Sequence, residues 1–276
     1  MKSFFPILLL LILSGCSFGE KEGIKLPVEL EEAPTTFINY ELKSIVQKKG
    51  PCATDSTSTG CLNVNINYPI LSEGPIQNVI GSINKRIKED IFENAFINDK
   101  PESFESLIIE ITEGYEDVLK AYKDYSTEWS LEISADIIYQ SKQFISLATS
   151  IYSYTGGAHP NSYLVYKTYD LKTGNRISLN DFLVEGFEDK LNRSAEIEFR
   201  MNHEILPSIK LSDAGYFFEE DKFVLNDNFA VMDGSLLFYF NPYEITSYAQ
   251  GPDELQIYLS DYKSLIKPGG LLDNLK

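Results

Sequence analysis

Two aromatic-rich runs with alternating apolar and polar residues flank a seven-residue loop, TGGAHPN, and this arrangement most constrains the fold. The runs are Phe144–Tyr154 and Ser162–Leu171. Alternation with a period of two is typical of β-strands, and a Gly-Gly pair between strands predicts a hairpin because glycine adopts positive φ without steric cost. Pro160 fixes its own φ and lacks a backbone donor, so we expect a stiffened loop at Thr155–Asn161 rather than a minimal turn.

Further strand patterns precede this hairpin. Phe37–Val46 is rich in β-formers, and Leu62–Tyr68 alternates strictly between apolar and polar residues. A third pattern, Trp129–Tyr139, is expected to form an antiparallel meander with the two hairpin strands. Trp129 is the only tryptophan, and we interpret it as a core anchor rather than a platform for stacking sugars.

Two helices are predicted between the second and third of these strands. Pro75 opens a segment in which isoleucines recur at three- and four-residue steps as far as Phe92. A second apolar stripe runs from Phe104 to Tyr122, with acidic residues off the stripe. Such a stripe can bind a partner, but we expect this one to pack on the sheet of its own domain.

The remainder of the chain predicts a second, smaller set of elements after a turn at Lys172–Asn175. Ser178 and the pair Asn180-Asp181 are cap-type residues ahead of a helix that repeats apolar residues every fourth position from Phe187 to Ile205. Four short strands and a terminal helix follow: Phe223–Leu225, Asn228–Val231, Leu236–Phe240, Glu254–Leu259 and Ser260–Ile266.

Residues 1–15, MKSFFPILLLLILSG, have the features of a signal peptide and are not expected to join the fold. Lys2 gives a positive start, and the apolar core Ile7–Leu13 is too short to span a membrane as a mature helix. The LSGC ending resembles the bacterial lipobox, which implies that Cys16 becomes the lipid-modified first residue and anchors the protein in a membrane. The alternative is an ordinary secretory signal followed by an incidental cysteine.

Residues 16–34 are rich in glycine, proline and acids and predict a flexible tether between the lipid and the first domain. Part of this stretch, Ile24–Leu30, is alternatively the beginning of a first strand. Ser17 after the lipidated cysteine resembles sorting to the outer membrane of a Gram-negative cell. We therefore expect a lipid-anchored protein of the cell envelope.

Cys52 and Cys61 bracket a Ser/Thr/Gly loop between two predicted strands. In a protein exported to an oxidising space, a disulfide is the expected pairing. In the chain-entropy model, closing so short a loop stabilises the fold by roughly 2–3 kcal/mol. Metal ligation or a reactive thiol is the alternative, but no histidine lies nearby in the sequence.

The formal net charge of −17 argues against a nucleic-acid partner, because phosphates require a basic patch. The same charge disfavours anionic polymers and favours basic partners through electrostatic steering. A simple contribution to solubility is the alternative explanation.

No sequence motif indicates catalysis. The chain has two histidines, of which His203 lies on a predicted helix and is interpreted as structural. His159 lies in the hairpin loop, where functional residues concentrate, but its neighbours in TGGAHPN supply neither a nucleophile nor metal ligands. No zincin, nucleophile-elbow, phosphate-loop or Rossmann pattern is present, so we expect no cofactor and no metal.

Three segments together carry a family resemblance: YTGGAHPN, YDLKTGNRISLNDF, and FNPYEITSYAQGP at Phe240–Pro252. They resemble the extracytoplasmic module shared by RsiV-type lysozyme-sensing anti-sigma factors and PdaC-type peptidoglycan deacetylases. The resemblance implies a PdaC-type domain over residues 35–171 and an RsiV-type domain over residues 172–276. It also implies an α+β fold of two lobes, in which antiparallel sheets are each packed against helices.

The sequence shows neither a transmembrane helix nor a deacetylase domain like those of the relatives. We therefore expect a non-enzymatic recognition module for a cell-wall-active protein such as lysozyme, or for peptidoglycan. The alternatives are a wall-processing hydrolase or deacetylase-associated enzyme that uses His159 as a base, and a structural envelope lipoprotein. The candidate contacts, which are equally candidates for fold-defining turn residues, are Tyr154, Gly156, Gly157, His159, Asn161, Tyr243 and Tyr248.

Overall fold

The computed structural model describes residues 38–55, 60–73, 77–95, 100–122 and 124–272. Residues 36–276 form one compact unit that contains a five-stranded and a three-stranded sheet. The predicted signal peptide, Cys16 and the tether lie outside the described residues, as does Pro75. Among the described residues, no helix is both long and apolar enough to cross a membrane.

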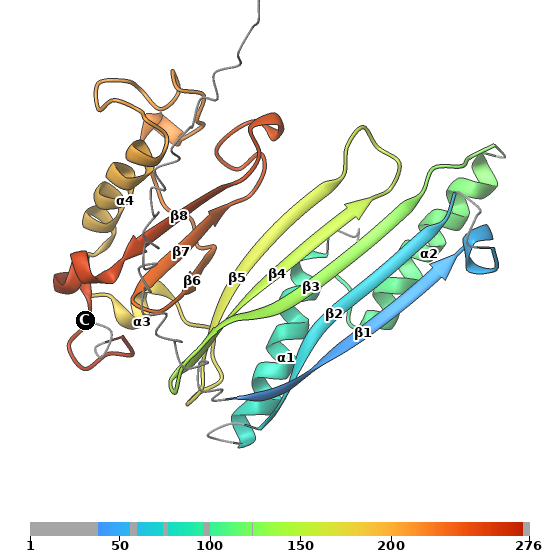
Figure 1. Cartoon of the computed structure of the whole chain (residues 1–276), viewed down its shortest axis with the longest axis horizontal. Coiled ribbons are helices and arrows are strands. Elements are labelled where there is room, and N and C mark those ends of the chain that lie inside the picture. The colour runs from blue at the N-terminus through green and yellow to red at the C-terminus, as the bar shows by residue number, and fades with distance from the viewer. Residues whose placement is uncertain (1–37, 56–59, 74–76, 96–99, 123, 273–276) are drawn as a thin grey trace, which may run out of the picture. The chain divides into compact units, whose positions relative to one another are not determined.

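The five strands of the larger sheet lie side by side in the order in which they occur in the chain (Figure 1). The meander of the last three strands is antiparallel, as predicted, and its register pairs Ile151 with both Ile133 and Tyr163. The predicted strands are confirmed, although the first two extend beyond the predicted ends. Their bounds are Asn39–Lys49 (β1), Leu62–Glu73 (β2), Trp129–Gln140 (β3), Phe144–Tyr154 (β4) and Asn161–Asp170 (β5).

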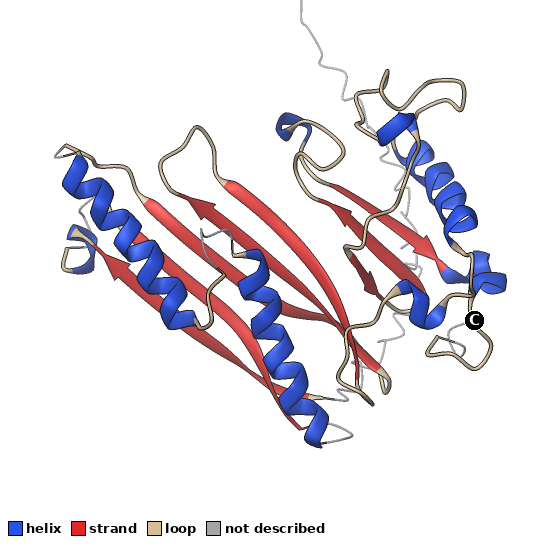
Figure 2. Ribbon diagram, turned by 180° about the vertical axis from the view of Figure 1, so that it is seen from behind, coloured by secondary structure: helices blue, strands red, loops and turns tan. Residues whose placement is uncertain are grey.

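Both predicted helices of the first lobe cover one face of this sheet (Figure 2). They are α1, Gln77–Asn94, and α2, Phe104–Ala121, and both lie in the connection between β2 and β3. A crossover of this length returns the chain in the same direction, so β2 and β3 pair in parallel. The expectation of purely antiparallel sheets is therefore wrong for this one pair, while the α+β class is confirmed.

The apolar stripe of α2 packs inward, as predicted. Ser103 caps the helix by accepting a hydrogen bond from the Ser106 backbone N–H (3.0 Å), and the Ser106 hydroxyl accepts one from the Ser103 backbone N–H (3.1 Å). Leu107 and Tyr115 are completely buried, and the Tyr115 ring lies edge-on to Trp129 with centroids 5.6 Å apart. Trp129 is 8% exposed, so its predicted role as a core anchor is confirmed.

The second lobe packs two helices and a three-stranded antiparallel sheet around an aromatic core. The prediction of a strand at Phe223–Leu225 is wrong, because Phe223 instead fills the core beside Phe199, with ring centroids 5.1 Å apart. The terminal helix is a 3₁₀ helix, Leu259–Leu265. The other elements are Leu179–Phe182 (α3), Glu188–Asn202 (α4), Phe229–Val231 (β6), Ser235–Phe240 (β7) and Asp253–Tyr258 (β8).

Side-chain amides of the second lobe bind the backbone of β5. Asn241 accepts a hydrogen bond from the Leu164 N–H (2.8 Å) and donates one to the Leu164 carbonyl (3.1 Å). Asn228 accepts from the Tyr166 N–H (2.7 Å) and also donates to the Leu164 carbonyl (2.8 Å). These amides satisfy β5 groups that would otherwise be unpaired at the edge of the five-stranded sheet.

Two buried hydroxyls add a second set of bonds between the lobes. The Ser146 hydroxyl donates to the Val231 carbonyl (2.5 Å), and the Val231 N–H donates to the Thr168 hydroxyl (3.0 Å). Phe144 on the same strand as Ser146 belongs to the aromatic core of the second lobe. The first half of β4 is therefore buried on both faces, which explains its nearly continuous run of buried residues. The domain boundary at residue 171 remains a prediction.

The predicted disulfide is present. Cys52 and Cys61 are bonded, with Cα atoms 5.8 Å apart, and the bond bridges the β1–β2 connection. Cys61 is completely buried. The alternative of metal ligation is wrong for these two cysteines, because their sulfur atoms are bonded to each other.

The asparagine contacts predict a measurable contribution to stability. We expect Asn228→Ala to lower the free energy of unfolding by about 2–3 kcal/mol, because it leaves the Tyr166 N–H and the Leu164 carbonyl short of partners in a partly buried position. Asn65→Ala is the matched control, since Asn65 is exposed and, among the described residues, its side chain bonds Asn67 alone (3.0 Å); its effect should stay within about 0.5 kcal/mol. Urea unfolding measures both, and equal effects would contradict this assignment.

Candidate functional site

The fold brings the TGGAHPN loop against the segment that follows β7. Asn241, which bonds Leu164 near the start of β5, begins this segment, and Tyr243 and Tyr248 follow it. The β4–β5 loop ends at Pro160, directly before β5 begins at Asn161. The asparagine contact therefore fixes the two segments side by side, although they are more than 80 residues apart in the chain.

His159 lies in contact with both tyrosines. Its ring stacks on Tyr248 with centroids 3.9 Å apart and planes inclined by 21°. Its Nε2 atom lies 3.2 Å from the Tyr243 hydroxyl, and the Tyr248 hydroxyl donates to the Pro160 carbonyl at 3.1 Å. We call His159, Tyr243 and Tyr248 the aromatic cluster.

Tyr243 is held in an uncommon backbone conformation. Its φ is 70°, in the left-handed region, which costs a non-glycine residue on the order of 1–3 kcal/mol. The turn is closed by Glu244, whose N–H donates to the Asn241 carbonyl (3.0 Å) and whose carboxylate accepts from the Asn241 N–H (2.8 Å). The Tyr243 side chain is nevertheless 60% exposed, so the strained turn presents an aromatic ring to solvent.

The structure divides the seven predicted contact residues into two groups. His159, Tyr243 and Tyr248 form the aromatic cluster, whereas the others shape the loop. The Tyr154 hydroxyl donates to the Gly157 carbonyl (3.1 Å), and Asn161 pairs with Ser153 at the exposed start of β5. Gly156 has a φ of 88°, and a Cβ atom there would overlap the Tyr125 hydroxyl.

The ring nitrogens of His159 bond a backbone carbonyl and a tyrosine hydroxyl. The Nδ1 atom of His159 lies 2.9 Å from the Pro160 carbonyl, which can only accept, so this nitrogen carries a proton. In the neutral ring, Nε2 then accepts from the Tyr243 hydroxyl. Within the described residues, the hydrogen bonds and ion pairs of His159 include no carboxylate, and no three metal-ligating side chains are grouped.

His203, interpreted as structural, ties α4 to β8. Its Nε2 atom lies 2.7 Å from Asp253, and its ring packs on Phe199 with centroids 4.5 Å apart. Burial raises the pKa of Asp253, although the neighbouring imidazole lowers it. These contacts agree with the structural interpretation.

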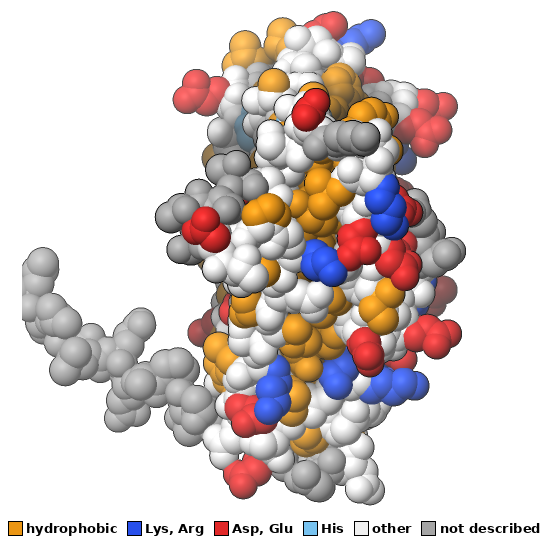
Figure 3. All heavy atoms as spheres, turned by 90° about the vertical axis from the view of Figure 1, so that its right-hand side faces the viewer, with side chains coloured by type: hydrophobic (Ala, Val, Ile, Leu, Met, Phe, Trp, Pro, Cys, Tyr) orange, Lys and Arg blue, Asp and Glu red, His pale blue; other side chains and the backbone are white. Residues whose placement is uncertain are grey.

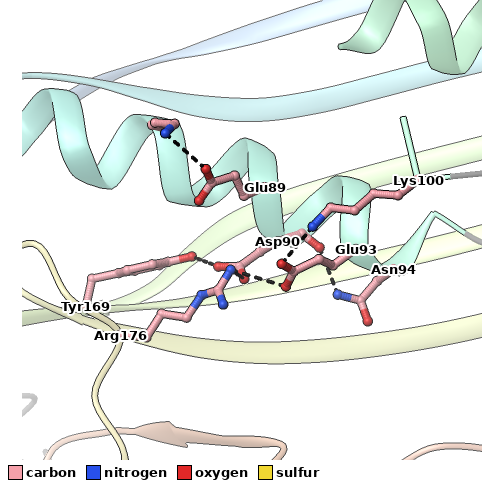
Figure 4. A network of polar contacts seen from close by, with 8 residues as sticks. Glu89, Asp90, Glu93, Asn94, Lys100, Tyr169 and Arg176 are labelled. Carbon is pink, nitrogen blue, oxygen red and sulfur yellow. Dashed lines mark hydrogen bonds and ion pairs between the residues drawn. The ribbon is translucent and has the colours of Figure 1, made fainter. Parts of the chain in front are cut away.

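A buried polar network between α1 and β5 was not predicted from the sequence (Figure 4). Asp90 is 3% exposed and accepts a hydrogen bond from the Tyr169 hydroxyl, and it forms an ion pair with Arg176. Arg176 also pairs with Glu93 at 3.3 Å, and Glu93 pairs with Lys100 at 3.0 Å. A signal was available, because Asp90 follows Ile83 by seven residues and Ile87 by three, which places it on the apolar stripe of the helix.

Arg176 connects this network to an open cleft. The cleft has a volume of about 570 Å³ and is also lined by Lys167, Asn192 and Asp227. None of the seven predicted contact residues lines it. The buried carboxylate is already bound by Tyr169 and Arg176, so we interpret the network as a structural tie between α1, β5 and the turn that follows β5.

The network predicts a pH dependence of stability. Burial raises the pKa of Asp90, against the Tyr169 hydrogen bond and the Arg176 charge, which lower it. The folded protein therefore binds this proton more tightly than the unfolded chain does. The stabilising contribution is fully present below the ordinary carboxyl pKa and is lost as the pH rises through the raised value. The free energy of unfolding of the wild type minus that of Asp90→Asn should decrease as the pH rises from the ordinary carboxyl pKa through the raised pKa of Asp90.

Tyr169→Phe provides a second test. It removes the hydrogen bond that lowers the pKa of Asp90, so the decrease in the stability difference between wild type and Asp90→Asn should move to higher pH when both carry Tyr169→Phe. Denaturant unfolding at a series of pH values measures the shift. A wild-type minus Asp90→Asn difference that grows with pH would show that the ion pair with Arg176 outweighs burial.

Comparisons with known proteins agree with this architecture. Residues 56–162 match the family model described as Deacetylase PdaC, and residues 180–260 match the model described as Protein of unknown function (DUF3298). A search of curated proteins found no match.

Two solved structures share the fold. A DUF3298 family member from Bacteroides fragilis NCTC 9343 is 19% identical, with a TM-score of 0.67 over 87% of this chain and 97% of that one. A DUF3298 family protein from Pseudomonas aeruginosa PAO1 is 20% identical, with a TM-score of 0.62 over 84% and 95% of the two chains. The predicted resemblance is thus confirmed: this chain carries a PdaC domain followed by a DUF3298 domain.

Proposed function

We propose that this protein is a non-enzymatic recognition module of the cell envelope, which binds a basic, cell-wall-active protein such as lysozyme through the aromatic cluster. The proposal includes a lipid anchor at Cys16 in the outer membrane of a Gram-negative bacterium. The observation that carries it is the exposed Tyr243 ring, held in place by a strained turn and by His159.

Preorganisation supports a binding role. Large aromatic side chains dominate binding energy at protein interfaces, and rings that are already fixed lose little conformational freedom on association. Here the stack of His159 on Tyr248 and the hydrogen bond to Tyr243 order the three side chains before any partner arrives. A strained residue that the surrounding structure maintains is a common feature of ligand-binding sites.

Charge supports a basic partner. The formal net charge of −17 steers cationic proteins toward the molecule and repels anionic polymers. Lysozymes of the animal type are basic proteins that act on the cell wall, so they meet both requirements. An anionic glycan meets the charge requirement less well.

Peptidoglycan is the second candidate, and one observation favours it. The Tyr243 side chain is 60% exposed, and the apolar faces of sugar rings stack on exposed aromatic rings. Binding of peptidoglycan fragments through these rings would depend little on the protein's net charge.

Catalysis by His159 is the less favoured hypothesis. A general base needs a reacting group or an orienting acid within hydrogen-bond reach, whereas the ring nitrogens of His159 face a backbone carbonyl and the Tyr243 hydroxyl. Assay of peptidoglycan hydrolysis and deacetylation with the wild type and His159→Ala checks this preference. A wild-type activity that the substitution abolishes would replace the binding proposal.

Calorimetric titration of residues 36–276 with a basic animal lysozyme, at low and moderate salt, tests the proposed function. We expect micromolar or tighter binding that Tyr243→Ala weakens at least about tenfold, because the substitution removes an exposed aromatic anchor. Tyr258→Ala is the matched control, since Tyr258 is 55% exposed but belongs to β8 and lies outside the aromatic cluster.

Salt and the two variants separate the outcomes. Binding that disappears at moderate salt, or that both variants weaken equally, would mean only nonspecific attraction between an acidic and a basic protein. Absence of heat with lysozyme, together with binding of peptidoglycan fragments that requires Tyr243, would favour the second candidate. Absence of both would favour a structural lipoprotein.

A further inference from the structure

The outer edge of β1 has no strand partner among the described residues. β1 is the first strand of the five-stranded sheet and pairs only with β2. It is eleven residues long, and every second residue of an edge strand directs its backbone N–H and C=O away from the sheet. The other edge of this sheet differs, because Asn228 and Asn241 bind the backbone of β5.

Apolar side chains accompany this free edge. Leu42 is 61% exposed and Val46 is 65% exposed, both on β1. Between β1 and α2 lies a groove of about 540 Å³ lined by Ile45, Ile108 and the half-exposed Ile109. Figure 3 faces the β1 side of the molecule and shows hydrophobic side chains running in a stripe between charged ones. An apolar groove beside an unpaired edge is the arrangement that accepts an added strand.

Glutamates of α2 rim the groove. Glu105, Glu113 and Glu116 all line it. Glu116 is paired with Lys49 at 2.7 Å, whereas Glu105 and Glu113 have no ion-pair partner within the described part of the chain. This rim favours an occupant that carries positive charge.

The same charges disfavour a second copy of this chain. Two-fold pairing of β1 with β1 would extend the sheet and bring two α2 helices together across the new pair. The rims of both grooves would then meet, and like charges at an interface cost several kcal/mol. Lys49 is already engaged by Glu116 and cannot neutralise the other two glutamates as well.

We propose that the β1 edge and the β1–α2 groove bind an extended segment of a partner protein by strand addition. The segment has apolar residues at alternate positions, which enter the groove beside Ile45 and Ile109. It has lysine or arginine near its ends, where Glu105 and Glu113 lie. Backbone hydrogen bonds supply affinity, and the groove selects the side chains. This site is separate from the aromatic cluster and does not rest on the proposed function.

A synthetic peptide tests the proposal with residues 36–276. The probe alternates valine and threonine and has two lysines at each end, with a fluorophore for anisotropy measurements. We expect it to bind in the micromolar range and to slow amide hydrogen exchange in residues 39–49 but not in residues 155–161. N-methylation of alternate residues, which removes the donors for strand pairing, or glutamates in place of the terminal lysines, should abolish binding.

Matched protein variants locate the site. Ile109→Lys should weaken binding by about tenfold, because it replaces an exposed apolar contact of the groove with a charge and does not disturb the core. Ile197→Lys is the control, since Ile197 is 60% exposed in another apolar groove, on α4. Absence of binding, equal binding of the N-methylated peptide, or equal weakening by the control would overturn the proposal. A dimer in sedimentation that Ile109→Lys dissociates would assign the edge to self-association instead.

Discussion

The hydrogen bonding of the β5 edge is the interaction on which the arrangement of this molecule depends. A central β-sheet must satisfy the backbone groups of its outer strands or leave them to water. Here the Leu164 and Tyr166 backbone groups bind the side chains of Asn241 and Asn228 instead of another strand. An amide side chain carries one acceptor and two donors, so it reproduces the pairing of a neighbouring strand at a single point. The three-stranded sheet can therefore have its own direction and its own core.

The contact of Asn241 with β5 also brings the aromatic cluster together. Asn241 binds Leu164 and at the same time begins the turn that places Tyr243 beside His159. The loop at the end of one hairpin and a turn of the other lobe thus meet at a position fixed by backbone contacts. The rigidity of these contacts explains how a non-glycine residue is maintained at a φ of 70°.

The two edge strands of the larger sheet differ in what covers them. At the β5 edge, the second lobe also covers the sheet, so the first half of the neighbouring strand β4 is buried on both faces. The Ser146 and Thr168 hydroxyls bond the Val231 backbone groups between the two cores. At β1, the edge is left open, with Leu42 and Val46 exposed. Lys43 and Lys48 on the same strand provide charge that discourages uncontrolled edge-to-edge aggregation. These lysines limit uncontrolled association at the open edge, to which we propose that an extended segment binds.

The sequence by itself determined most of the elements and their order. Period-two alternation located β4 and β5, three- and four-residue spacing located α1, α2 and α4, and the bracketing cysteines indicated the disulfide. These features follow from local rules, because strand and helix geometry decide which neighbours in sequence share a face. The aromatic residues His159, Tyr243 and Tyr248 were also identified individually as candidates.

Only the tertiary structure decided how distant segments meet. It made β2 and β3 parallel, since the packing of α1 and α2 on one face sets the direction of the returning strand. It buried Asp90 against Tyr169 and Arg176, and it turned Phe223 into a core residue rather than part of a strand. It also stacked His159 on Tyr248. Such contacts join residues that are distant in the sequence, and their energies depend on packing that no local pattern encodes.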